Sequence, residues 1–306
     1  MSEVLIVGSV ALDTVETPFG RVGRALGGAA TYAATAASFF TGVRMVGVVG
    51  EDFPEEHLDF LRSRGVDLRG LERVPGKTFH WSGRYVGDLS QAETLATDLN
   101  VFADFNPTLP EAYRDTEYVF LANIDPELQR NVLRQVRAPR WTACDTMNFW
   151  IAGKRAALLE LLEQVHLVLL NDAEARQLTG ESDLGRAAQQ ILQGGPQAVV
   201  IKKGAHGAAL YTEQPGESFP RWFSVPSYPV PVVRDPTGAG DSFAGGLMGY
   251  LAATEDLSEP NLRRAVVYGS VLASFNIEDF SLNRQRTLTR EEIEERYEGF
   301  RRITAF

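Results

Sequence analysis

The sequence is poor in the residues and runs that mark several common protein classes. It has a single cysteine, Cys144, so no disulfide can form within the chain. That cysteine lies in the apolar run WTACDTM, where we expect a buried small hydrophobe and not a nucleophile. No apolar run approaches the ~20 residues that a membrane span needs, and the first residues lack the basic region of a signal peptide. We therefore expect a cytoplasmic protein with no membrane partner.

Basic charge and several well-known motifs are also scarce. The 30 lysines and arginines stand against 40 aspartates and glutamates, and the net charge of −10 argues against nucleic acid as a partner. The sequence lacks a P-loop, a Gly-x-Gly-x-x-Gly dinucleotide motif, a Gly-x-Ser-x-Gly nucleophile elbow and any zinc-ligand spacing. An anionic nucleotide would have to be held by backbone N–H groups, a metal ion and a few basic side chains.

The string DPTGAGDSF at 235–243 is the most informative stretch of the chain. It follows a short extended segment at 227–233 and precedes a helical pattern at 243–253, so we predict a strand-to-helix turn. Gly238, Ala239 and Gly240 would enter the helix, whose first N–H groups lack intrahelical partners. Glycines let an anion approach those groups, and the helix dipole favours negative charge there. The turn therefore predicts an anion hole.

Asp241 stands at the end of this turn, where a carboxylate would repel a bound phosphate. The placement is explained if the carboxylate takes a proton from a nucleophile that attacks the phosphate. General-base catalysis of this kind contributes ~10²–10⁴-fold in rate. The alternative is a Gly-rich turn whose aspartate only caps a helix. The length of the whole string favours the catalytic interpretation.

The string resembles the second signature of the PfkB carbohydrate kinase family, which has the ribokinase-like fold. The resemblance implies ATP as the phosphate donor, with Mg²⁺, and Asp241 as the catalytic base. It also implies that Gly238, Ala239 and Gly240 hold the transferred phosphoryl group, that Thr237 contacts the nucleotide, and that Asp235 helps a monovalent cation site, for example for K⁺.

The N-terminal third has two further features of this family. The apolar run at 4–12 predicts a buried parallel strand that ends at Asp13, where open α/β sheets bind ligands. Gly27 and Gly28 then open an Ala-rich helix and let the backbone approach a ligand. The resemblance implies that Asp13 and the two glycines bind the substrate. Tyr32 stands where many relatives have an asparagine, and would partly fill the substrate pocket.

Alternating strand and helix patterns predict an α/β fold with a doubly wound, mostly parallel central sheet, as in ribokinase-like proteins. Two segments at 14–26 and 76–107 read instead as hairpins, which predict a small projecting β-sheet lid. The resemblance implies that the edges of such a lid form a homodimer interface. We expect residues 1–306 to form a single kinase domain, because no linker or repeat interrupts the chain.

Asn171 and Glu174 directly follow a strand pattern and form an N-x-x-E sequence. One interpretation is a capping box that starts a helix. The resemblance implies that the pair also organises Mg²⁺ and phosphates, largely through water, which suits the oxygen preference of that ion. The same resemblance assigns four more residues to the nucleotide site: Lys203, Gly204, Gly207 and Asn276.

Together these features predict an ATP-dependent kinase that phosphorylates a hydroxyl group of a sugar or sugar-like molecule. A nucleoside kinase on the same scaffold is the alternative, because Tyr32 and the aromatic residues Phe79, Trp81 and Tyr85 suit an aromatic base. A catalytically silent sugar- or nucleotide-binding regulator is a third alternative. The charge of Asp241 argues against the regulator, because binding alone would be better served without it.

Overall fold

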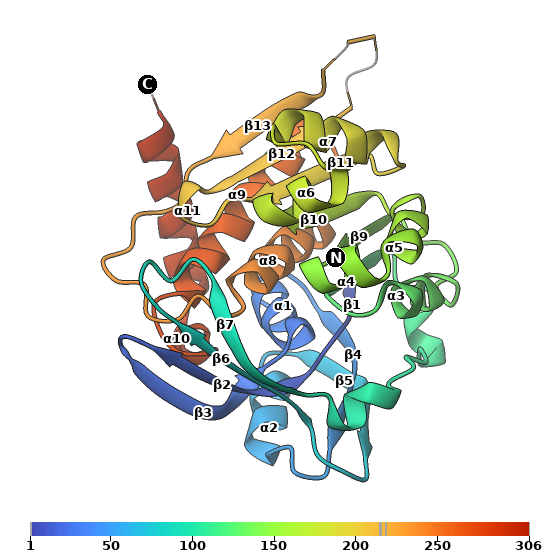
Figure 1. Ribbon diagram of the computed structural model, residues 1–306, viewed down its shortest axis with the longest axis vertical. Coiled ribbons are helices and arrows are strands. Elements are labelled where there is room, and N and C mark those ends of the chain that lie inside the picture. The colour runs from blue at the N-terminus through green and yellow to red at the C-terminus, as the bar shows by residue number, and fades with distance from the viewer. Residues whose placement is uncertain (1, 214–215, 218, 306) are drawn as a thin grey trace.

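The computed structural model describes residues 2–213, 216–217 and 219–305, and its centre is a nine-stranded sheet (Figure 1). In sheet order its strands are β13 (Arg221–Val225), β12 (Ala208–Thr212), β11 (Ala198–Lys202), β10 (Leu167–Asn171), β9 (Trp141–Asp145), β8 (Tyr118–Leu121), β1 (Val4–Val7), β4 (Val43–Gly50) and β5 (Val66–Val74). From β11 to β5 the neighbours run parallel, and β12 and β13 are added antiparallel at one edge. This large sheet confirms the predicted mostly parallel fold class.

Helices cover both faces of the large sheet. Successive strand residues point to opposite faces, so in β1 Val4 and Ile6 enter one apolar core while Leu5 and Val7 enter the other. The first core lies under α1 (Ala29–Ala37), α2 (Glu55–Ser63), α8 (Ala239–Thr254), α9 (Glu259–Asn276) and α11 (Arg290–Thr304). The second lies under α3 (Pro126–Leu133), α4 (Asn148–Gly153), α5 (Arg155–Leu162), α6 (Asp172–Thr179) and α7 (Leu184–Gln193). Short helical segments complete the chain: η1 (Asn100–Asp104), η2 (Glu111–Tyr113), η3 (Gly204–His206) and α10 (Asn283–Thr287).

A second, small sheet has the strand order β3-β2-β6-β7 and projects beside the large one (Figure 1). Its strands are β2 (Ala11–Thr17), β3 (Gly20–Gly27), β6 (Phe79–Tyr85) and β7 (Ala92–Asp98). Hairpins join β2 to β3 and β6 to β7, while β2 and β6 pair in parallel. The two hairpins predicted from the sequence therefore form one sheet.

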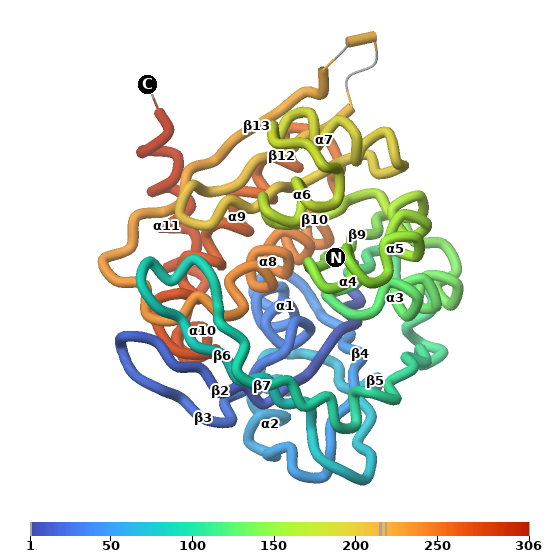
Figure 2. Tube along the Cα trace, viewed as in Figure 1, coloured from blue at the N-terminus to red at the C-terminus, as the bar shows by residue number. Residues whose placement is uncertain are grey.

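The apolar run at 4–12 does not form one strand, which corrects the prediction. β1 ends at Val7, and the chain then leaves the large sheet and enters the small one as β2, as the blue trace in Figure 2 shows. Gly8 lies at this exit, where an added Cβ would be 2.7 Å from the Cβ of Ala122. Asp13 consequently belongs to the small sheet and not to the end of a core strand.

Two local expectations were also wrong, and one strand was not predicted. The segment 227–233 pairs with no strand in the described part of the chain, so the turn at 235–243 follows a loop. In the sequence, Asp52 and Glu55 fit the N-cap pattern of a helix expected from about 53 to 63, but Pro54 occupies the N-cap of α2 and Asp52 instead accepts hydrogen bonds from Thr78. The strand β5 had no counterpart in the prediction.

Two expectations drawn from scarce features can be compared with the structure. Cys144 is buried, as the apolar run around it predicts. Among the described residues, no helix combines the length and the apolar character that crossing a membrane requires.

Candidate active site

The predicted anion hole is the start of α8, and α8 lies beside α1 in the middle of the molecule (Figure 1). Gly238 is its N-cap residue and has φ of +75°, a conformation that favours glycine. An added Cβ at Gly238 would also lie 2.4 Å from the ring of Tyr32. The amide of Ala239 donates to the carbonyl of Pro236, whereas the amides of Gly240 and Asp241 reach no other backbone carbonyl in the described part of the chain. The N–H group of Gly240 can therefore serve an anion, whereas that of Asp241 donates to the carboxylate of its own side chain.

A buried network fixes this turn from the other side. Asp235 is fully buried, and its two carboxylate oxygens accept hydrogen bonds from the amides of Thr237 (2.9 Å) and Ser281 (3.0 Å). Asn276, at the end of α9, donates to the carbonyl of Thr237 (2.7 Å) and accepts from the hydroxyl of Ser242 (3.1 Å). The structure therefore gives Asp235 and Asn276 a supporting role for the turn, and burial raises the pKa of Asp235.

Asp13 approaches the turn from the small sheet. Its carboxylate packs against Gly27, where an added Cβ would lie 2.0 Å from Oδ2. Burial, reinforced by the nearby carboxylate of Asp235, raises the pKa of Asp13 to about 7, and a hydrogen bond from the amide of Gly28 partly opposes this. Asp241 acts on Asp13 in the same direction as Asp235. The predicted substrate residues and the predicted anion hole thus share one site.

A second group of charges meets Asp241 from the large sheet. Nζ of Lys202 lies 2.6 Å from Oδ2 of Asp145, and these residues end strands β11 and β9. Burial and the charge of Asp145 raise the pKa of Asp241 to about 6, while Lys202 lowers it. Burial also raises the pKa of Glu174 to about 7, again with Lys202 acting in the opposite direction. Sequence reasoning overlooked Lys202 and Asp145, although both stand at carboxyl ends of parallel strands, where such sheets bind ligands.

Asn171 and Glu174 form the capping box of α6. Oδ1 of Asn171 accepts from the amide of Glu174 (2.8 Å), and Oε2 of Glu174 accepts from the amide of Asn171 (2.7 Å). The pair can cap the helix and also help to hold Mg²⁺, because the capping box uses Oε2 of Glu174 and leaves Oε1 for a ligand. The described residues contain no cluster of three carboxylate, histidine or cysteine side chains that would bind a metal directly. This donor set fits Mg²⁺, which retains much of its water.

The predicted nucleotide residues after β11 lie at the same edge of the sheet, but not all point to Asp241. Nζ of Lys203 is 3.3 Å from the hydroxyl of Ser224 on β13 and is exposed. Gly204 and Gly207 form the turn to β12 with φ of +53° and +83°. An added Cβ at Gly207 would lie 2.0 Å from the carbonyl oxygen of Val225, so only glycine fits there.

The small sheet contacts the anion hole through an aromatic residue. The hydroxyl of Thr237 lies 3.3 Å from the hydroxyl of Tyr85 at the end of β6, and burial raises the pKa of Tyr85 to about 12. Trp81 pairs in register with Asp13, and its indole lies across Gly83, where an added Cβ would be 2.1 Å from the ring. Phe79 instead stacks on Phe102 of η1, with ring centroids 5.2 Å apart.

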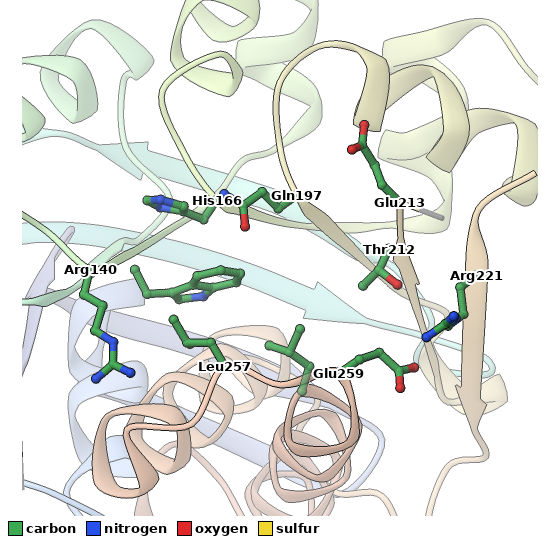
Figure 3. Close-up of a pocket in the computed structure, with 10 residues that line it drawn as sticks. Arg140, His166, Gln197, Thr212, Glu213, Arg221, Leu257 and Glu259 are labelled. Carbon is green, nitrogen blue, oxygen red and sulfur yellow. The ribbon is translucent and has the colours of Figure 1, made fainter. Parts of the chain in front are cut away.

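A separate hollow of about 510 Å³ lies at the opposite, amino-terminal edge of the large sheet (Figure 3). Figure 3 shows Arg140 and His166 at one end of it, and Arg221 and Glu259 at the other. None of the residues predicted for the kinase site lines this hollow. The site around Asp241 is therefore the one to which the sequence and the geometry both point.

Comparison with known proteins gives a consistent result. Residues 1–287 match the family described as pfkB family carbohydrate kinase. The cytidine kinase of Thermococcus kodakarensis (strain ATCC BAA-918 / JCM 12380 / KOD1) is 34% identical over 254 residues, which cover 82% of this chain and 89% of that protein. The structure of Methanocaldococcus jannaschii nucleoside kinase is similar with a TM-score of 0.76 at 20% identity, covering 98% of this chain and 99% of that one. The structure of a putative ribokinase II from E. coli with ATP and Mg²⁺ has a TM-score of 0.77 at 20% identity, covering 99% and 100%.

Proposed function

The chain belongs to the PfkB family of carbohydrate kinases, and we propose that within this family its acceptor is a nucleoside. The prediction of an ATP-dependent phosphotransferase that acts on a hydroxyl group of a sugar or nucleoside is confirmed. Kinases of this family use ATP and Mg²⁺. The choice between the two acceptor classes is the proposal.

The observation that favours a nucleoside is the pairing of Asp13 with Trp81. These residues are register partners on the parallel strands β2 and β6, so their side chains leave the same face of the small sheet, with the strands about 4.8 Å apart. Asp13 would accept hydrogen bonds from ribose hydroxyls, while the indole of Trp81 offers a plane on which a base can stack. Gly83 supports this, because its lack of a side chain leaves room for the indole.

Tyr32 is a second reason to favour a nucleoside over a free sugar. Its side chain is buried, and its ring packs under Gly238, beside the predicted substrate residues. Tyr32 gives a free sugar no hydroxyl contact of the kind that an asparagine at this position would offer. A nucleoside would instead gain a contact between its base and the indole of Trp81. The 34% identity to a cytidine kinase supports the same choice.

In the proposed mechanism, Asp241 accepts the proton of the acceptor hydroxyl as that oxygen attacks the γ-phosphate. The backbone amides of Gly238 and Gly240, which reach no backbone carbonyl in the described part of the chain, hold the charge of the transferring group, whereas the amide of Ala239 is already bonded to Pro236. Mg²⁺ held near Asn171 and Glu174 through water would offset phosphate charge when bound. Asp13 fixes the acceptor, and the contact between Tyr85 and Thr237 closes the small sheet over the anion hole and excludes water.

Further parts of the proposal concern the cation, the assembly and the setting. We propose a K⁺ site beside Asp235, which is tested by comparing turnover in KCl with turnover in NaCl.

We propose that the small sheet is a lid on a single domain. We also propose that it forms the homodimer interface, because β7 is largely exposed and carries Leu95 with 46% exposure. Sedimentation of a Leu95→Asp variant tests the dimer. A cytoplasmic location is proposed for the chain because its cysteine is unpaired, and cell fractionation tests this.

The decisive experiment is an ADP-release assay with ATP and Mg²⁺ against cytidine, uridine, adenosine, inosine, ribose and fructose. We expect turnover with a nucleoside, and Asp241→Asn should abolish it. Trp81→Ala should raise the KM for that nucleoside about tenfold or more, since base stacking on an aromatic side chain is worth ~1–3 kcal/mol. Trp222→Ala, on exposed β13, is the matched control and should leave KM unchanged. Turnover confined to free sugars, or an unchanged KM in Trp81→Ala, would overturn the nucleoside proposal.

A further inference from the structure

Lys202 places a positive charge directly beside the anion hole. It is the last residue of β11 and pairs in register with Asn171, the last residue of β10. Its side chain is 17% exposed, and its ammonium lies 2.6 Å from the carboxylate of Asp145, which is 6% exposed. An added Cβ at Gly240 would lie 3.1 Å from Nζ of Lys202. The ammonium therefore sits against the first turn of α8, where the predicted phosphoryl site lies.

The charges around Lys202 keep it protonated and leave it able to bind an anion. Burial disfavours the ammonium, but the carboxylates of Asp145, Glu174 and Asp241 together raise the pKa of Lys202 above its ordinary value. An ammonium has three donor hydrogens, and the bond to Asp145 uses one. The neighbouring Lys203 points elsewhere, toward Ser224.

We propose that Lys202 is a catalytic residue whose ammonium contacts the transferred phosphoryl group. The acceptor oxygen forms a bond to the γ-phosphorus, and its proton passes to Asp241. The bond from the γ-phosphorus to the bridging oxygen breaks, and its electron pair leaves with ADP. Lys202 keeps its proton throughout and offsets the negative charge on the phosphoryl oxygens, while Asp145 holds the ammonium in place. This inference rests on the proposed phosphoryl site at Gly238–Gly240 and is independent of which acceptor binds.

A purely structural role for Lys202 must be separated from a catalytic one, because Lys202→Met also leaves the buried carboxylate of Asp145 without its partner. We therefore compare Lys202→Met, Asp145→Asn and the double variant, in which both charges are removed. Lys202→Met should lower kcat by ~10²–10³-fold, the loss that accompanies removal of one donor to transition-state charge. The KM for ATP should change much less. The double variant should be as slow as Lys202→Met. A double variant that recovers the kcat of Asp145→Asn would overturn the proposal.

Two further variants separate the loss of charge at Lys202 from general effects of substitution. Lys202→Arg retains the charge and should have a kcat at least tenfold above that of Lys202→Met, and equal kcat values in both would also contradict a catalytic charge. Lys154→Met, whose lysine pairs with Asp125 and Glu127 on the surface, is the matched control and should keep wild-type kcat. Thermal unfolding of each variant checks folding.

The series uses whichever acceptor the wild type phosphorylates. A free sugar as acceptor would refute the nucleoside proposal while leaving the Lys202 comparison intact. A Lys202→Met variant with wild-type kcat on a nucleoside would refute the role of Lys202 alone.

Discussion

Asp241→Asn should remove activity and at the same time stabilise the protein at neutral pH. Asp241 is partly buried, and desolvation raises its pKa from 3.8 to about 6, so its charged form is less favourable in the folded chain than in the unfolded one. Converted at about 1.36 kcal/mol for each tenfold change in proton affinity, this difference is about 3 kcal/mol. Asparagine is neutral, like the protonated acid, and avoids that cost. The loss of the general base should lower kcat by ~10²–10⁴-fold.

The pH dependence gives this prediction a sign that can be checked. Above the folded pKa of about 6, Asp241 is charged in both states, and the full cost of burying it applies. Below the unfolded value of 3.8 the residue is protonated in both states, and the cost is absent. The stability advantage of Asp241→Asn should therefore be largest at pH 7 and should shrink as the pH falls from 6 toward 4.

Urea unfolding followed by fluorescence at pH 7, 5 and 4 measures this advantage, with ADP release measured on the same preparations. Asp59→Asn is the matched control, because Asp59 is an exposed partner of Arg62 and its loss should change stability by less than about 0.5 kcal/mol. An Asp241→Asn variant that is less stable than the wild type at pH 7, or whose advantage does not change with pH, would refute the reasoning.

Three other perturbations have expected outcomes. The kcat/KM for ATP should fall below about pH 6 as Asp241 takes up a proton. In Asp145→Asn this fall should move to lower pH, because Asp145 raises the pKa of Asp241. The pH profiles of wild type and variant test this, and coincident profiles would contradict it. Gly238→Ala should lower kcat at least ~10-fold, because the positive φ and the ring of Tyr32 both oppose a side chain; steady-state kinetics near wild type would refute this. Tyr85→Phe should lower kcat/KM about fivefold, since it removes one hydrogen bond worth ~1 kcal/mol; an unchanged value would show that the contact with the anion hole is unimportant.

The parts of the fold that local chemistry determines could be predicted from the sequence. The run VRMVGVVG at 43–50 predicts a buried strand because its Val, Met and Gly residues suit burial on both faces, and β4 has these ends. The sequence predicts the helix α6 because Asn171 and Glu174 fit a capping box and Gly180 suits a helix end, and in the structure Gly180 ends the helix in the left-handed conformation. At the anion hole, the start of α8 could likewise be predicted, because the positive φ of its N-cap residue, Gly238, favours glycine.

The parts that depend on long-range packing could not be predicted. The run at 4–12 is apolar throughout because both sheets bury it, so no change in hydrophobicity shows where β1 ends and β2 begins. The choice between Lys202 and Lys203 depends on where β11 ends: Lys202 is its last residue and reaches Asp145, whereas Lys203 follows the strand and reaches Ser224. A shift of one residue in the predicted strand end reverses that assignment.

The division of the site between two sheets affects the order of events in turnover. Asp13 and Trp81 belong to the small sheet, whereas Asp241 and Lys202 are held by the large sheet and the helix packed on it. In the proposed mechanism the acceptor would therefore contact the small sheet and the phosphate donor the large one, and the distance between the attacking oxygen and the phosphorus would depend on how the two sheets pack. If the proposed site is correct, a substitution in the β2–β3 hairpin should change the fraction of bound acceptor that is phosphorylated, although this hairpin need not contact either substrate.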